Sequence, residues 1–223
     1  MVNALFNIAT KNKPCIIFVD EIKGLLEDCD GGEGGSNGAK VVTVLLTAMQ
    51  NLSKDQVFVL GASNYPWKLD KAFLRRFSQI IYVPLPTLGD RVQILKQNIY
   101  QNQSTTINDI SIDDIEQLAL LTEQYSGSHL SKVVVAAMAI RYQRVAASKY
   151  FKRSIKGKNY WQPCTKHEEG ARQMSTKQVP KLVMPPLIMK DLELALSEIK
   201  NNIGTAYLKK LVKWGEKNSD MRD

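Results

Sequence analysis

The chain has 223 residues, of which 44% are hydrophobic and 23% charged, and a formal net charge of +8. This composition is typical of a globular protein with a sizeable core, and no apolar run reaches the roughly 20 residues that a membrane-spanning helix needs. Three cysteines give no paired disulfide framework, and Cys164 with His167 forms a C-x-x-H pair that no second pair completes into a zinc site. The many lysines late in the chain accompany no zinc finger or aromatic RNA-binding pattern, so we interpret them as a solvated face and expect no specific nucleic-acid partner.

Helices and strands alternate through the first part of the chain. Residues 2–10 and 39–52 place apolar side chains at helical spacing. Residues 15–20 and 57–63 are continuous apolar runs of strand length, which predict strands covered on both faces, and "IIYVPL" at 80–85 predicts a third strand. This alternation predicts an α/β fold with a parallel sheet.

The pattern becomes helical after the prolines at positions 84 and 86, so a boundary is expected near residue 87. A basic, turn-rich stretch at 150–181 interrupts the helical part, with short strands expected near "NYWQPC" and "ARQMST". Asp191 is expected in the first turn of one of the closing helices. Helical spacing covers residues 88–100, 111–124, 128–149, 187–200 and 205–217.

Two adjacent carboxylates, Asp20 and Glu21, stand at the end of the first apolar strand. In nucleotide hydrolases such a pair places the Asp near magnesium while the Glu orients or deprotonates the attacking water; solvated acids at a strand exit are the alternative. Asn64 ends the next strand, where its amide could reach the same water or the terminal phosphate. Arg75 and Arg76 follow a short helix, and paired arginines suit charge that develops on a transferred phosphoryl group.

Three stretches, "KPCIIFVDEI", "GASNYPWKLDKAFLRRF" and "IIYVPLP", together resemble the core of AAA ATPases of the meiotic clade. The resemblance implies that Asp20 and Glu21 are the Walker B pair, with Asp20 near a nucleotide-bound Mg²⁺. It also implies that Asn64 is sensor 1. Arg75 and Arg76 would be arginine fingers that act on the ATP of a neighbouring subunit in a ring, commonly a hexamer.

The segment "YSGSHL" at 125–130 resembles the helix start that lies near the adenine in this family. The resemblance therefore implies cofactor contacts at Gly127 and Ser128, together with Asn98 at another base-proximal position. It also implies a fold class, a partial AAA+ parallel-sheet nucleotide-binding domain followed by a helical small domain with a short β insertion and C-terminal helices. The implied segments are 1–87 (C-terminal part of the large α/β subdomain), 88–150 (helical small subdomain), 151–181 (a basic insertion resembling the β domain) and 182–223 (closing helices and the C-terminal helix).

Within the clade, "QPCTKHEEGARQMS" and "YLKKLVKWGEKNS" resemble the β insertion and the closing helix of the vacuolar protein sorting branch. That branch disassembles ESCRT-III polymers, and its insertion receives an accessory activator. The resemblance thus implies a cytoplasmic protein recruited to endosomal membranes, with peripheral membrane association only through partners. Asn218 replaces the aromatic residue that the branch carries near its C-terminus.

Other positions depart from the family pattern. Lys23 stands where the family has a second acid after Walker B, and His129 replaces the Asp at the small-domain helix start. Both changes add positive character, which would weaken subunit contacts unless partners compensate. The Gly-rich residues 31–38 resemble the second pore loop, although a plain connector explains them equally well.

A G-x-x-x-x-G-K-[ST] phosphate loop does not occur in the 223 residues. Backbone donors of such a loop supply most of the grip on a nucleotide, so we expect no measurable ATPase activity from this chain alone. We also expect the natural gene product to be longer, and the sheet here to carry unpaired apolar edges that are prone to aggregation.

The sequence leaves three functions open. The first is an ATP-driven unfoldase or disassembly motor, for which this chain is the C-terminal portion, and it is the one we favour. The second is a microtubule-severing enzyme like katanin or spastin, whose basic surface would meet acidic tubulin tails. The third is a non-hydrolysing ring subunit that contributes only Arg75 and Arg76 in trans.

Overall fold

The computed structural model describes residues 2–22, 43–49, 56–101, 109–154 and 160–218. The chain divides into two compact units. One comprises Met1–Val83 with Gly204–Asp223, and the other comprises Pro84–Ile203. Lys23 and the Gly-rich residues 31–38 lie outside the described residues.

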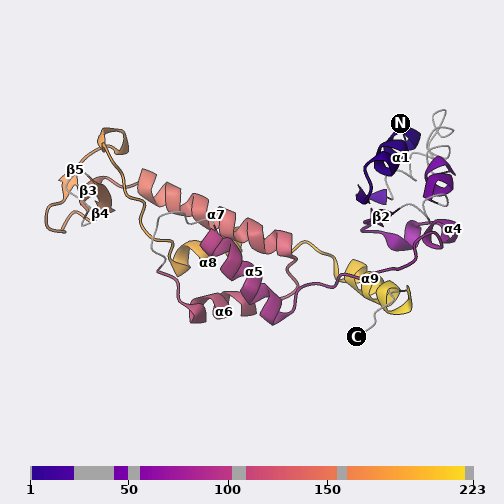
Figure 1. The fold of residues 1–223 in the computed structure, drawn as a ribbon. Coiled ribbons are helices and arrows are strands. Elements are labelled where there is room, and N and C mark those ends of the chain that lie inside the picture. The colour runs from indigo at the N-terminus through magenta and orange to yellow at the C-terminus, as the bar shows by residue number, and fades with distance from the viewer. Residues whose placement is uncertain (1, 23–42, 50–55, 102–108, 155–159, 219–223) are drawn as a thin grey trace, which may run out of the picture. The chain divides into compact units, whose positions relative to one another are not determined.

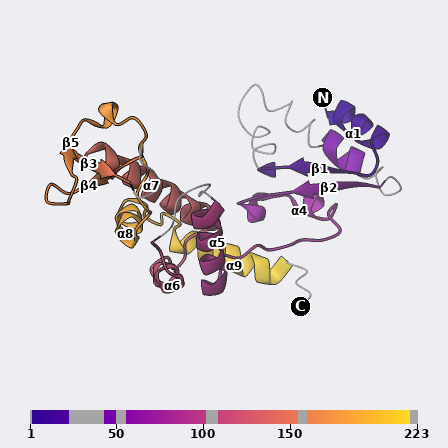
Figure 2. The ribbon, with the colours of Figure 1, turned by 60° about the vertical axis from the view of Figure 1, so that its left-hand side comes forward.

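The first unit is built on two parallel strands, β1 and β2, which lie side by side with α1 next to them (Figure 2). Their register runs from Cys15 opposite Val57 to Val19 opposite Gly61. Phe6, Ile17 and Phe73 lie in one buried apolar cluster on one side of this sheet. The elements are α1 (Val2–Lys11), β1 (Cys15–Val19), a helical stretch at residues 43–49, β2 (Val57–Gly61), η3 (Pro66–Lys68), α4 (Lys71–Leu74) and α9 (Thr205–Asn218).

The expectation that both strands are covered on both faces is wrong. Ile17 is buried, but Ile16 and Phe18 on the opposite face of β1 are 68% and 60% exposed. Phe58 and Leu60 of β2 are likewise 66% and 54% exposed. Side chains alternate between the two faces of a strand, and the packing partners in this cluster cover only one of them.

The strand expected at residues 80–85 does not form. A strand exists only as part of a hydrogen-bonded ladder, and among the described residues the parallel sheet consists of β1 and β2 alone. Tyr82 in this segment instead packs against α9. A Cβ added at Gly215 would lie 2.6 Å from the Cγ atom of Tyr82, so the absence of a side chain at Gly215 permits this approach.

The second unit is a helical bundle that carries a small antiparallel sheet at one end of α7 (Figure 1). Its core includes Leu95, Leu118, Leu130, Val134 and Leu192, all fully buried. None of the helices in the described part of the chain is long and apolar enough to cross a membrane. The helices are α5 (Leu88–Gln101), α6 (Ile112–Leu120), α7 (Gly127–Ala146) and α8 (Met189–Glu198).

Side-chain caps determine where two of these helices begin. The Ser111 hydroxyl accepts the N–H of Asp114, and the Asp114 carboxylate accepts the N–H and hydroxyl of Ser111, which forms a reciprocal capping box on α6. Ser126 caps α7 by accepting the N–H of His129 at 3.3 Å. These caps satisfy backbone donors that a helix leaves unpaired in its first turn.

The insertion is a three-stranded sheet in the order β4-β3-β5. The two strands expected near "NYWQPC" and "ARQMST" correspond to β4 (Trp161–Cys164) and β5 (Arg172–Gln173). The central strand β3 (Tyr150–Arg153) was not predicted, and η4 (Thr176–Gln178) follows β5. β3 pairs antiparallel with both neighbours.

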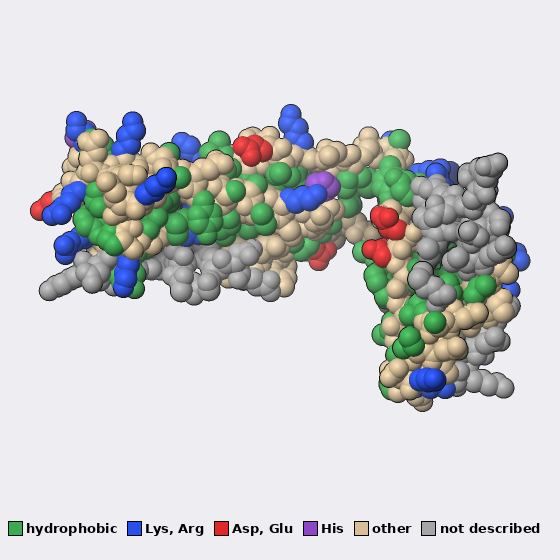
Figure 3. Space-filling view, turned by 90° about the horizontal axis from the view of Figure 1, so that it is seen from above, with side chains coloured by type: hydrophobic (Ala, Val, Ile, Leu, Met, Phe, Trp, Pro, Cys, Tyr) green, Lys and Arg blue, Asp and Glu red, His purple; other side chains and the backbone are tan. Residues whose placement is uncertain are grey.

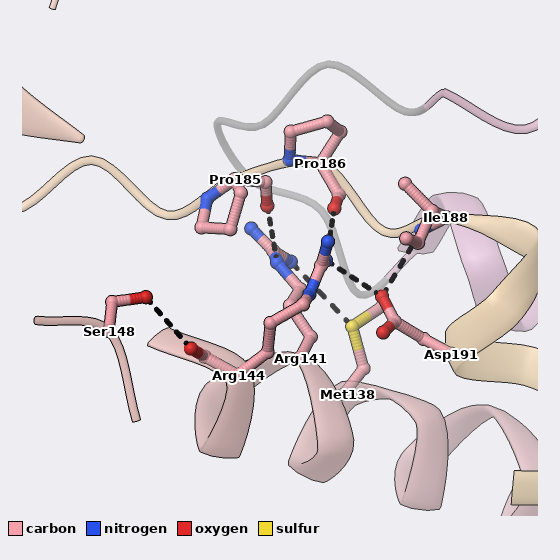
Figure 4. Close-up of polar contacts among 8 residues, drawn as sticks. All are labelled: Met138, Arg141, Arg144, Ser148, Pro185, Pro186, Ile188 and Asp191. Atoms are coloured by element: carbon pink, nitrogen blue, oxygen red, sulfur yellow. Dashed lines mark hydrogen bonds and ion pairs between the residues drawn. The ribbon is translucent and has the colours of Figure 1, made fainter. Parts of the chain in front are cut away.

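The chain returns from the insertion along the last turns of α7, where two arginines hold it (Figure 4). Arg141 Nε donates to the carbonyl of Pro185 at 2.6 Å, and Arg144 donates to the carbonyl of Pro186 at 3.0 Å. The same Arg144 nitrogen forms an ion pair at 2.9 Å with Asp191, which is 2% exposed in the first turn of α8. Desolvation on burial lowers the pKa of Arg141, although an arginine stays charged at any ordinary pH.

Candidate functional site

The carboxylates of Asp20 and Glu21 lie at the edge of the sheet where β1 ends. The ladder continues past the strands, because Ala62 donates to Val19 O at 2.9 Å and Ile22 donates to Ala62 O at 3.1 Å. The carboxyl ends of parallel strands meet at one edge, so Asn64, two residues beyond Ala62, belongs to the same edge as the acids. Asp20, Glu21 and Asn64 therefore follow two neighbouring strand exits at the same edge of the sheet, and all three are exposed.

The backbone at Glu21 is in the left-handed region, with φ of 47°. This region is unfavourable for a residue with a side chain, and such outliers cluster at functional sites. The Asp20 carboxylate accepts the N–H of Glu21 at 2.9 Å, which stabilises the sharp turn. On the other side of this turn, Ile22 is buried over Gly61, where an added Cβ would overlap its Cδ1 atom. The local fold thus holds Glu21 outward while anchoring its neighbour.

The loop that carries Asn64 is held by α9. The Tyr207 hydroxyl donates to the backbone carbonyl of Asn64 at 2.7 Å. Its ring lies edge-on to Tyr65 and Trp67, with centroids 5.6 and 5.7 Å away, and the Lys210 ammonium lies 4.5 Å from the Trp67 centroid. No local sequence pattern identifies Tyr207 as a contact of this loop, because Asn64 lies 143 positions away in the chain.

Arg75 and Arg76 lie at the exposed end of α4 rather than at the sheet edge itself. Asp70 caps this short helix by accepting the N–H of Ala72 at 2.7 Å, and the N–H of Arg75 donates to Lys71 O at 3.1 Å. Phe73, 1% exposed, fixes α4 to the core. Both arginines are thus exposed at the end of a short helix that Phe73 anchors.

The remaining predicted residues belong to the second unit. Asn98 is half-buried on α5, where its amide donates to Ile94 O at 2.8 Å. Gly127 is the first residue of α7, and a Cβ added there would be in ordinary contact, 3.8 Å from the Ile94 side chain. Ile94 thus brings α5 and the start of α7 together near Asn98, whereas Ser128 is exposed beside them.

The cap of α7 falls on Ser126, one residue before the predicted pair. His129 takes part in this cap, with its Nδ1 atom 2.7 Å from the Ser126 hydroxyl and its ring edge-on to Tyr125 at 5.9 Å. His129, which stands where the family has Asp, therefore contacts Ser126 and Tyr125 within this unit. Serine is a preferred N-cap residue, so Ser126 just before the helical spacing is the sequence signal that could have identified this cap.

The residues at this sheet edge could supply a ligand for the Mg²⁺ of a bound nucleotide, but not the groups that hold its phosphates. Mg²⁺ is usually held by one or two carboxylates together with substrate phosphates, and Asp20 offers such a carboxylate. The described ranges contain no group of three or more His, Cys, Asp or Glu side chains that could hold a metal without a nucleotide. This also applies to the surroundings of Cys164 and His167. The backbone cradle for the phosphates is not encoded in this sequence.

Two family models match the chain. Residues 1–85 match the ATPase family associated with various cellular activities (AAA), and residues 161–217 match the Vps4 C-terminal oligomerisation domain. The chain belongs to the AAA family. The parallel strands with polar residues at their exits are thus a portion of an AAA domain, as the sequence indicated.

Relatives of this AAA chain include vacuolar protein sorting-associated protein 4B from Mus musculus, which is 32% identical over 97% of the chain and 50% of the relative. Spastin from Danio rerio is 38% identical over 60% of the chain and 23% of the relative. The chain spans about half the length of the vacuolar protein sorting relatives that it matches.

Among solved structures, the AAA domain of FIGL-1 in complex with ADP is similar in fold. Its TM-score is 0.71 at 22% identity, and the match covers 99% of this chain and 63% of that one. The likeness confirms an α/β AAA fold.

Proposed function

We propose that this chain is the C-terminal part of an ATP-driven AAA motor that takes apart protein assemblies, with ESCRT-III polymers as its substrate. The observation that carries the proposal is the match of residues 161–217 to the Vps4 C-terminal oligomerisation domain. The vacuolar protein sorting relatives support it, because they align over 97% of the chain. The protein would be cytoplasmic and recruited to endosomal membranes.

The sheet edge supports a division of roles among three residues. Glu21 orients or deprotonates the attacking water, and the Asn64 amide holds that water or the terminal phosphate. Asp20 would hold Mg²⁺, which neutralises phosphate charge when bound. The outward turn at Glu21 supports this assignment, because a strained backbone is retained where a side chain must be presented in one direction.

The proposed motor works as a ring, commonly a hexamer, and the oligomerisation domain supports this assembly. The exposed Arg75 and Arg76 then act as arginine fingers on the ATP of a neighbouring subunit. Asn98, Gly127 and Ser128 contact the base. An accessory activator binds at the insertion, residues 151–181.

A version of the protein extended upstream to include a phosphate loop tests this proposal. The expected result is magnesium-dependent ATP turnover and disassembly of ESCRT-III filaments, with turnover lost in Glu21→Gln. Glu116→Gln, at an exposed acid on α6, is the control that keeps activity. Nucleotide binding and assembly without turnover in the unaltered protein would instead identify a non-hydrolysing ring subunit. The chain as it stands is expected to show no turnover.

A severing enzyme is the second candidate, favoured by the 38% identity to spastin. Microtubule severing by the extended version, with no effect on ESCRT-III filaments, would select it. Removal of the acidic tubulin tails should then abolish binding.

A further inference from the structure

The positive charge of the chain is concentrated in residues 149–181, which comprise the insertion of residues 151–181 and the two residues before it; this whole segment is called the basic insertion below. Residues 149–181 contain nine lysines and arginines against two acids, a net charge of +7 out of the chain's +8. The other 190 residues are therefore nearly balanced, at +1. A charge confined to one small module creates a directed local field rather than a generally basic surface.

The basic side chains of the insertion lie on its surface, and Figure 3 shows Lys and Arg gathered over this end of the second unit. Glu168, one of the two acids, is neutralised by Lys152 through an ion pair of 2.7 Å. Contact with the Lys152 ammonium, and then with the N–H and hydroxyl of Thr165, lowers the pKa of Glu168 to about 2. The basic residues that the structure describes here are Lys149, Lys152, Arg153, Lys166, Arg172, Lys177 and Lys181.

Among the aromatic residues of the insertion that the structure describes, only Tyr160 is exposed, so there is no row of accessible rings on which successive nucleic-acid bases could stack. Trp161 is 8% exposed, with the guanidinium groups of Arg153 and Arg172 at 5.8 and 5.7 Å from its ring. Phe151 is fully buried. Single-stranded nucleic acids need accessible ring faces for stacking, so the arrangement disfavours them.

Lysine also predominates over arginine on this surface. Lysines are compact point charges that act without a fixed geometry, whereas specific recognition of carboxylate or phosphate groups uses the planar arginine fork. Both described arginines of the insertion lie over the Trp161 ring at cation–π distance. Tyr160 is 42% exposed next to Lys181, and tyrosine is a residue favoured at membrane interfaces.

We propose that the described basic side chains of the basic insertion, within residues 149–154 and 160–181, bind directly to an anionic membrane surface. The sequence led us to expect membrane association only through partners; the charge and composition of this module add a direct contact with acidic lipid headgroups. Each lysine near such a surface improves membrane partitioning about five-fold, and the attraction decays within a Debye length of about 8 Å at physiological salt. The contact is therefore additive over the lysines and sensitive to salt.

Sedimentation of the full chain with vesicles tests the proposal. Vesicles of phosphatidylcholine with about 30 mol% phosphatidylserine should bind it at about 0.15 M salt, and pure phosphatidylcholine vesicles should not. The triple variant Lys149→Gln, Lys166→Gln, Lys177→Gln should lose about a hundred-fold in partitioning, and Lys177→Gln alone about five-fold. All three side chains are exposed, so the changes leave the core intact.

A matched control separates the module from net charge. Lys132→Gln, Lys190→Gln, Lys200→Gln also lowers the formal charge from +8 to +5 but lies outside the insertion, so it should bind nearly as the unaltered chain does. Equal loss in both triple variants would overturn the proposal, as would equal binding to neutral vesicles. Binding to polyglutamate or single-stranded DNA without binding to acidic vesicles would also overturn it, in favour of an acidic protein or a nucleic acid.

Discussion

Replacing Tyr207 with phenylalanine removes one hydrogen bond between α9 and the loop that carries Asn64. The bond is 2.7 Å long, and its acceptor belongs to an exposed residue that water can solvate after the change. A typical hydrogen bond contributes about 1 kcal/mol net, so α9 should open about five-fold more often in Tyr207→Phe. Tyr207→Ala also removes the ring contacts with Tyr65 and Trp67, and we expect a total of about 3 kcal/mol.

Native-state hydrogen exchange measures this opening directly. The α9 amides, such as that of Leu208, which donates to Gly204 O, should exchange faster, while amides of α7 serve as an internal reference. Tyr142→Phe, an exposed tyrosine on α7, is the matched control and should change neither helix. Unchanged α9 exchange in Tyr207→Phe would refute the idea that this hydroxyl holds the Asn64 loop.

The same bond predicts a dependence on alkaline pH. Burial, followed by the nearby Tyr65 and Tyr82, raises the pKa of Tyr207 above its usual value near 10. A raised pKa means that the folded state favours the protonated hydroxyl, so the stabilisation is complete below pH 10 and is lost as the pH rises through the folded-state pKa. After correction for the intrinsic exchange rate, α9 of the unaltered chain should loosen in that range, and Tyr207→Phe should lack the step.

Further changes test other contacts. Arg144→Ala should destabilise the second unit by about 2 kcal/mol in urea unfolding, because the buried Asp191 carboxylate loses a charged hydrogen-bond partner while it keeps the Ile188 N–H and the nearby Arg141; an unchanged midpoint would contradict the ion pair. Lys152→Met should raise the pKa of Glu168 part of the way from about 2 towards 4.5 in an NMR titration, because the Thr165 N–H and hydroxyl still contact the carboxylate. The stabilisation that the unaltered chain loses as pH falls from about 4.5 to 2 should therefore be smaller in the variant. Ser111→Ala should cost about 1 kcal/mol by removing the α6 cap, with Ser111→Thr retaining most of it.

The elements predicted best from the sequence are the amphipathic helices. Apolar residues at helical spacing over 88–100 and 128–149 identify α5 and α7 to within a few residues, because each helix buries a face against its neighbours. The polar residues at the two strand exits were also placed at one sheet edge, since parallel strands end together. The roles of Glu21 and Asn64 remain predictions.

Other features depend on what each segment packs against, which the local sequence does not encode. Ile16 and Phe18 suggest burial by composition, but their exposure depends on whether anything covers the second face of the sheet. Residues 80–85 have strand-like composition and still form no ladder. The bond from Tyr207 to Asn64 joins residues 143 positions apart, beyond the reach of periodicity.

The arginine contacts along α7 make the insertion separable from the helices. Helix α7 ends at Ala146, and the insertion follows it. Before α8 begins, the returning chain is bound to α7 again, because Arg141 and Arg144 donate to the carbonyls of Pro185 and Pro186. Whatever lies between these anchors can change in length or charge without disturbing the packing of α7 on α8. The module is thus suited to exchange: a relative's insertion grafted between residues 148 and 184 should fold on the same bundle and bring its own surface preference with it.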